Sequence, residues 1–112
     1  MHLHFQGHNE AKRPAKPIRE YMRQKFMLSE EYLGELRCFE YEGNIDEGQV
    51  LRLLIFNPHL ARRQHTPLQT HADLEQHPEV LLYEGYVDAQ GRIYIEDLRT
   101  MSYPERISGQ WL

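Results

Sequence analysis

The sequence predicts an α+β domain with a four-stranded, mainly antiparallel sheet made from two hairpins. A helical periodicity of apolar residues near the N-terminus predicts a helix that packs on this sheet. Two later stretches of strand-forming residues are each broken by a glycine-containing segment, which is typical of hairpins. The polar connection between the hairpins contains the start signal of a short helix. A helix and antiparallel hairpins in this order are characteristic of the α+β class.

The N-terminal helix is predicted over residues 17–27. Pro17 suits the first turn of a helix, where the missing N–H would have no partner. Apolar residues then recur at the spacing of one helical face and need a surface to cover. These residues are Ile18, Tyr21, Met22 and Phe26. Ser29 is a favourable cap for a second short helix or turn that ends near Leu36.

The first hairpin is predicted from a strand over residues 38–42 and a strand over residues 50–56. In the first strand, aromatic residues alternate with glutamates, which gives the strand one apolar face. The second strand is apolar on both faces apart from Arg52, as expected for a central strand that is covered on both sides. Residues 43–48 begin and end with glycine, and we expect them to form a hairpin loop longer than two residues.

The second hairpin is predicted over residues 80–87 and 92–98, with a turn in which Gly91 can adopt a positive φ. Gly85 interrupts the first of these strands and indicates a bulge or the close approach of another backbone. In the connection before this hairpin, residues 70–73 fit a capping box with aspartate in the last position. This pattern predicts the short helix between the hairpins.

Length and local composition predict one folded domain with an N-terminal extension. A chain of 112 residues fits a single domain. Residues 1–8 hold three of the seven histidines and resemble the remainder of a cleavable affinity tag, so they carry no functional argument. Residues 9–16 combine a proline with basic side chains and predict a basic extended arm. Residues 17–112 form the single α+β domain, in which Trp111 needs a surface on which to dock.

The overall composition is that of a soluble globular protein. Hydrophobic residues make up 40% of the chain and charged residues 27%. No apolar run approaches the roughly 20 residues that span a bilayer, so no membrane partner is expected. The single cysteine, Cys38, cannot form an internal disulfide, and no secretory signal pattern opens the chain. We therefore expect a cytoplasmic protein.

The net charge of −4 is unevenly distributed along the chain. Residues 1–30 carry six basic and three acidic side chains, whereas residues 31–112 carry seven basic and fourteen acidic ones. A basic segment on an acidic body can fold onto that body, contact a second subunit or attract nucleic acid. A surface that contacts phosphates would use the basic residues of the arm, the first helix and the connection. These residues are Lys12, Arg13, Lys16, Arg19, Arg62 and Arg63.

The polar residues form no recognisable catalytic or metal-binding motif. The four histidines outside the tag-like segment stand six residues apart, whereas metal ligands on a helix stand three or four apart. A metal site assembled from loops, with Asp73 or Glu79 as an added ligand, is an alternative to solvated loop histidines. His71 and Asp73 would point apart on a helix, which disfavours an acid–base couple. We predict no catalytic residue, no metal and no cofactor, and place Cys38 in the core.

The leading functional hypothesis is a non-catalytic protein-interaction module that acts as a homo-oligomer, most simply a dimer. Seven tyrosines are many for this length, several lie on predicted strands, and tyrosine is favoured at protein interfaces. The second hypothesis is a nucleic-acid-associated regulator that uses the basic arm. The third is a small-molecule-binding or catalytic domain with a pocket between sheet and helix. His71, Tyr83 and Tyr86 would line that pocket.

Overall fold

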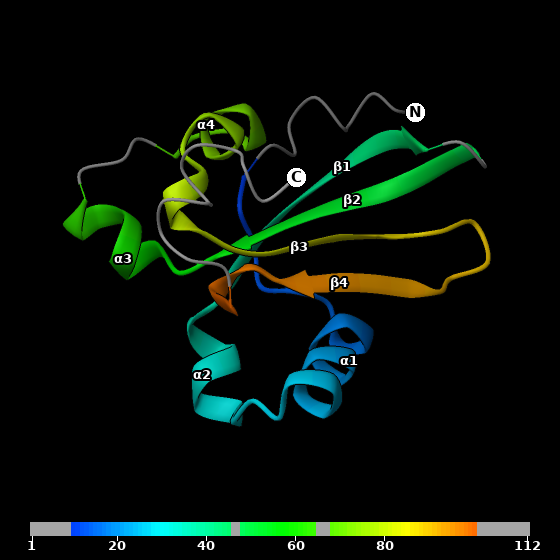
Figure 1. Cartoon of the computed structure of the whole chain (residues 1–112), viewed down its shortest axis with the longest axis horizontal. Coiled ribbons are helices and arrows are strands. Elements are labelled where there is room, and N and C mark those ends of the chain that lie inside the picture. Colours follow the sequence, from blue (N-terminus) through cyan, green and yellow to red (C-terminus); the bar gives the residue numbers. More distant parts are fainter. Residues whose placement is uncertain (1–9, 46–47, 65–67, 101–112) are drawn as a thin grey trace.

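Helices and strands follow one another in the predicted order, and the α+β class is confirmed (Figure 1). The computed structural model describes residues 10–45, 48–64 and 68–100 of the chain. No helix in these ranges is long and apolar enough to cross a membrane. The elements are α1 (Lys16–Phe26), α2 (Glu30–Glu35), β1 (Arg37–Ile45), β2 (Gly48–Phe56), α3 (Pro58–Arg63), α4 (His71–Gln76), η2 (Pro78–Val80), β3 (Leu81–Val87), β4 (Ile93–Asp97) and η3 (Leu98–Thr100).

The sheet contains the two predicted hairpins side by side. Its strands pair in sequence order, β1-β2-β3-β4, and every pair is antiparallel. α1 and α2 lie on one face of the sheet, and α4 lies on the other (Figure 1). α1 contacts β4 and α4 contacts β1, so the N-terminal helix packs on the sheet as predicted.

Strand β2 contributes to a hydrophobic core on each face of the sheet. Leu53 and Ile55 belong to the core beneath α1 and α2, whereas Leu54 and Phe56 belong to the core beneath α4. All four side chains are buried, which confirms the prediction of a central strand covered on both sides. Burying each such side chain stabilises the fold by about 1.5–3 kcal/mol relative to leaving it in water.

The predicted loop over residues 43–48 is wrong. β1 continues to Ile45 and β2 begins at Gly48, and these two residues are paired, so only two residues join the strands. Gly43 lies inside β1 because the stem of Arg52 occupies the space of a side chain there. A Cβ added to Gly43 would lie 2.5 Å from Cγ of Arg52. This glycine therefore serves side-chain packing within the hairpin and not a long loop.

Two short helices occupy the connection between the hairpins, and the sequence predicted only the second. Helix α3 begins directly after β2, where the Asn57 side chain accepts a hydrogen bond from the His59 N–H at 2.9 Å. The Asn-Pro pair at this point was interpreted only as the end of a strand. Helix α4 has the predicted capping box, in which the Thr70 N–H donates to the Asp73 carboxylate at 3.0 Å. Hydrogen bonds from the Gln69 and Thr70 N–H groups hold the pKa of Asp73 below its usual value.

The second hairpin has the predicted turn and the predicted close approach. The Asp88 N–H donates to the Arg92 carbonyl at 2.9 Å, and Gly91 adopts a φ of 84°. At Gly85, an added Cβ would lie 1.8 Å from the backbone oxygen of Tyr94, so no larger residue fits without a shift of the β4 backbone. The glycine in β3 therefore marks the close approach of a neighbouring strand.

The described part of the basic arm folds onto its own body. Lys12 and Cys38 exchange two backbone hydrogen bonds of 3.0 and 2.7 Å at the outer edge of β1. The Lys12 ammonium also lies 3.1 Å from the Glu40 carboxylate. The tag-like residues 1–8 and the tail with Trp111 lie outside the described residues.

Candidate functional site

A row of three tyrosines and one arginine crosses the sheet on the face opposite α1. Tyr41, Arg52, Tyr86 and Tyr94 are successive partners in the register of the four strands. At one end of the row, the His71 ring from α4 stacks on Tyr41 with the ring centroids 3.9 Å apart and the planes 10° apart. The helices therefore cover this face at the Tyr41 end, and the other three members of the row line an open groove.

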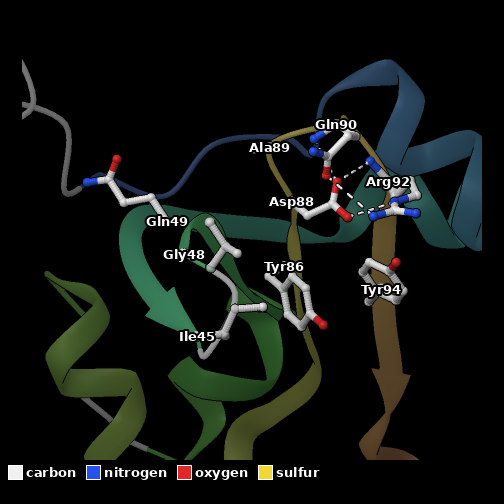
Figure 2. A pocket seen from close by; sticks show the side chains of 10 residues that line it. Ile45, Gly48, Gln49, Tyr86, Asp88, Ala89, Gln90, Arg92 and Tyr94 are labelled. Carbon is white, nitrogen blue, oxygen red and sulfur yellow. Dashed lines mark hydrogen bonds and ion pairs between the residues drawn. The ribbon is translucent and has the colours of Figure 1, made fainter.

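Two adjoining hollows form this groove, and both are lined by Ile45, Tyr86 and Tyr94. We call it the tyrosine groove after its two tyrosines. The first hollow, of about 500 Å³, lies between the tip of the β1–β2 hairpin and the turn between β3 and β4. Figure 2 shows Tyr86 and Tyr94 beside each other below that turn. The second hollow, of about 390 Å³, continues over Arg52, Glu84 and Glu96 toward α1.

The aromatic pair of the groove presents ring surface to solvent. The Tyr86 and Tyr94 ring centroids are 4.9 Å apart with the planes tilted by 32°. Tyr94 is 42% exposed, and within the described ranges only Met27 is a more exposed large hydrophobic residue. Aromatic pairs of this geometry contribute about 0.5–1.5 kcal/mol beyond their buried area. The two rings thus form a fixed platform that a partner can contact.

Two carboxylates stand next to the aromatic pair and face each other across the hairpin. Glu84 and Glu96 are direct partners in the β3–β4 register, one pair along from Tyr86 and Tyr94. Burial raises the pKa of Glu84, and the neighbouring Glu96 raises it further, while the nearby Arg52 lowers it. The negative charge beside the aromatic pair is therefore unfavourable in the unbound protein.

The turn above the groove is held by an internal ion pair. The Arg92 guanidinium donates to the Asp88 carboxylate at 2.8 Å, and the same carboxylate accepts from the N–H groups of Gln90 and Arg92 at 2.9 Å each (Figure 2). These contacts fix the rim of the first hollow. They also neutralise both charges, so the turn adds no net charge to the groove.

The three residues predicted to line a ligand pocket are not brought together. Tyr83 is fully buried under α1, where its ring centroid lies 5.2 Å from that of Phe26. Tyr86 stands three residues further along the same strand and therefore points to the opposite face. His71 lies against Tyr41 at the α4 end. Only Tyr86 of the three lines the tyrosine groove.

The six basic residues proposed for phosphate contacts are spread over separate surfaces. Lys12 is paired with Glu40 beside β1, and the Arg19 guanidinium donates to the Pro14 carbonyl at 2.6 Å. Arg13 and Lys16 are exposed near the start of α1, whereas Arg62 and Arg63 belong to α3. Figure 1 shows α3 at the left end of the sheet and α1 beneath its middle. The described basic residues thus form no single phosphate-binding surface.

The remaining chemically reactive groups do not converge. Cys38 is fully buried, and burial raises the pKa of its thiol to about 12, so the thiolate is scarce at neutral pH. The cysteine lies in the core, as predicted. Histidine, cysteine and carboxylate side chains nowhere gather in threes as a metal site would require, as far as the described ranges extend.

No protein-family model, curated protein or solved structure matches this chain. The sequence did not single out Arg52, Glu84 and Glu96 as site residues, and Tyr94 was not among the residues predicted to line a pocket. The signal was present at Arg52, the one charged residue in an otherwise apolar strand, because charged side chains are rarely fully buried and so indicate an opening at that position of the covered strand.

Proposed function

We propose that the protein is a non-catalytic protein-interaction module whose binding surface is the tyrosine groove. The observation that carries this proposal is the pair of the half-buried Tyr86 and the exposed Tyr94, held on a sheet whose opposite face is covered by helices. Tyrosine is enriched at interface hot spots because it offers a large contact area at a low cost in conformational entropy.

The shape and charge of the groove favour a segment of a protein over the two alternative ligands. Two adjoining hollows suit an extended chain, which presents successive side chains at regular intervals. Glu84 and Glu96 disfavour nucleic acid in the groove, because their carboxylates, one register pair from the aromatic pair, would repel its phosphates. A catalytic pocket would need converging acid, base or nucleophilic groups, and the groove residues supply no such set.

The homodimer and the cytoplasmic location stay predictions within this proposal. A face-to-face dimer through the groove would bring the glutamates of two copies toward each other, so the groove favours a different partner over a second copy. Analytical ultracentrifugation of the full chain at tens of micromolar measures the oligomeric state directly. A homodimer with a micromolar dissociation constant is populated at that concentration. A monomer under these conditions removes the homo-oligomer and leaves the interaction module in place.

Selection from a random-peptide display library tests the interaction module. We expect the wild-type chain to enrich peptides that bind the Tyr86→Ala/Tyr94→Ala variant about tenfold more weakly or worse, because the variant removes the aromatic hot spot. Met27→Ala is the matched control, since it removes the other highly exposed apolar side chain and leaves the groove intact. Failure to enrich any peptide, or equal binding by the double variant, contradicts the proposal.

A further inference from the structure

We infer that the tyrosine groove binds an arginine side chain of its partner segment, with the guanidinium against Tyr94 and between Glu84 and Glu96. This inference rests on the proposed function and specifies the chemistry of the partner. It begins from an unfavourable feature of the free protein. Glu84 and Glu96 are direct cross-strand partners, and like charges in that position destabilise a sheet.

The cations already near the groove leave this pair incompletely neutralised. Lys25 of α1 lines the second hollow, but its ammonium donates to the Tyr21 hydroxyl at 3.0 Å and to the Ile95 carbonyl at 3.3 Å rather than to Glu84 or Glu96. Arg92 is paired with Asp88 in the turn. Arg52 offsets part of the charge on Glu84, while Glu75 of α4 adds to it. Glu96 is exposed and forms no ion pair within the described part of the chain.

The aromatic pair selects a planar cation over a compact one. A guanidinium stacks on a tyrosine ring and donates two parallel hydrogen bonds to a carboxylate, whereas an ammonium is a strongly hydrated point charge. Tyr94 supplies the exposed ring, and Glu96 lies two residues along the same strand, on the same side. Arginine therefore matches both neighbours at once.

The first hollow indicates which kind of partner residue lies two positions from the arginine. Ile45 and Val50 give its β1–β2 side an apolar wall, whereas Asp88, Gln90 and Arg92 line the side of the β3–β4 turn. Side chains of an extended segment point to the same side at every second residue. A segment with arginine in the second hollow therefore places an apolar side chain two positions away in the first hollow.

Two matched peptides test this inference on the full-length chain. One is acetyl-Ser-Arg-Ser-Val-Ser-amide, and the other carries citrulline, the neutral isostere, in place of arginine. In an NMR titration of the ¹⁵N-labelled chain, we expect the arginine peptide to bind about tenfold more tightly or better, because charge-assisted hydrogen bonds are roughly twice as strong as neutral ones. We expect Glu84→Gln/Glu96→Gln to abolish this preference.

Glu42→Gln is the matched control, because Glu42 is an exposed strand glutamate that points to the other face of the sheet. It should keep the preference for the arginine peptide. Equal binding of the two peptides, or no binding of either, overturns the inference, and the proposed function survives if display-selected peptides still depend on Tyr86 and Tyr94. Self-association that blocks the groove without any peptide also overturns it, since the occupant is then a second copy. A melting curve of the double variant verifies that it is folded.

Discussion

Tyr83 and Tyr86 stand three residues apart on β3 and point to opposite faces of the sheet. Tyr83 is fully buried beneath α1, and burial raises the pKa of its hydroxyl. Tyr86 lies in the tyrosine groove beside the partly exposed Tyr94. The same residue type therefore packs in the core on the covered face and lines an accessible groove on the open face. The elements that cover each face, and not the residue type, separate the two roles.

The charges on the two faces show the same contrast. Among the described residues, the buried side chains beneath α1 and α2 are apolar apart from one cysteine and one tyrosine, and the glutamates on that side of the sheet, Glu40 and Glu42, lie on the edge strand β1 opposite leucines. The open part of the other face places two glutamates directly opposite each other. A sheet that served stability alone would have no use for such a pair. The covered face is organised for folding, and the open face keeps an unfavourable arrangement that a ligand can relieve.

Truncation of the covered face should have the largest effect on stability. Leu53 is fully buried between the sheet and the helices, and Leu53→Ala should lower the free energy of unfolding by about 2–5 kcal/mol through lost burial and a cavity. Urea denaturation followed by circular dichroism measures this loss. If Leu53→Ala lowered the free energy of unfolding by less than Tyr94→Ala does, the proposed difference between the two faces would be wrong.

Substitution of Gly85 should have the next largest effect, because a side chain there would collide with the backbone of β4. We expect Gly85→Ala to cost about 1–3 kcal/mol or more, since the added Cβ would overlap the Tyr94 carbonyl. Gly34→Ala is the control, because a Cβ on this glycine meets no atom within 4 Å. Thermal melting of both variants distinguishes the clash from a general effect of losing glycine. Equal melting temperatures would show that β4 adjusts freely.

Truncation on the open face should cost less stability. Tyr94→Ala removes one ring of the aromatic pair, and we expect it to lower the free energy of unfolding by about 0.5–1.5 kcal/mol. The same variant should lose the display-selected peptides. Urea denaturation and peptide titration of one preparation measure both quantities. Full retention of peptide binding would remove Tyr94 from the binding surface.

Removal of one groove carboxylate should have the smallest effect and the opposite sign. The folded-state pKa of Glu84 is raised, so its ionised form opposes folding, and this cost appears as the pH rises through its titration. Glu84→Gln should therefore stabilise the protein at pH 7 by about 0.2–1 kcal/mol. The gain should disappear in acid, where Glu84 is protonated in both states. A comparison of the melting temperatures of both proteins in acid and at pH 7 measures this gain, and destabilisation by Glu84→Gln at pH 7 contradicts the expectation.

The fold followed from the sequence wherever a local pattern determines the structure. The helical spacing of Ile18 and Met22 and the glycine turn at Gly91 are set by neighbouring residues. Local patterns failed at residues 43–48, because Gly43 makes room for Arg52 on the next strand and does not mark a loop. The pairing of Glu84 with Glu96 required knowledge of the register.

The candidate site was harder to predict because it depends on which face the helices leave open. Alternation along the predicted strand already places Tyr83 and Tyr86 on opposite faces, but it does not say which face the helices cover. Only the position of α1 and α2 buries the first and leaves the second in the groove. For the same reason, sequence reasoning grouped His71 with them although it lies against Tyr41.

Amide-shift mapping of a display-selected peptide on the ¹⁵N-labelled full chain shows directly whether the tyrosine groove is the binding surface. We expect the largest shift changes on β3 and β4 at Tyr86, Tyr94 and Glu96, with smaller changes in the part of α1 that lines the second hollow and little change in α2 or α3. Shift changes centred on α2 or α3, with the signals of Tyr86 and Tyr94 unmoved, would contradict the assignment of the open face as the binding surface.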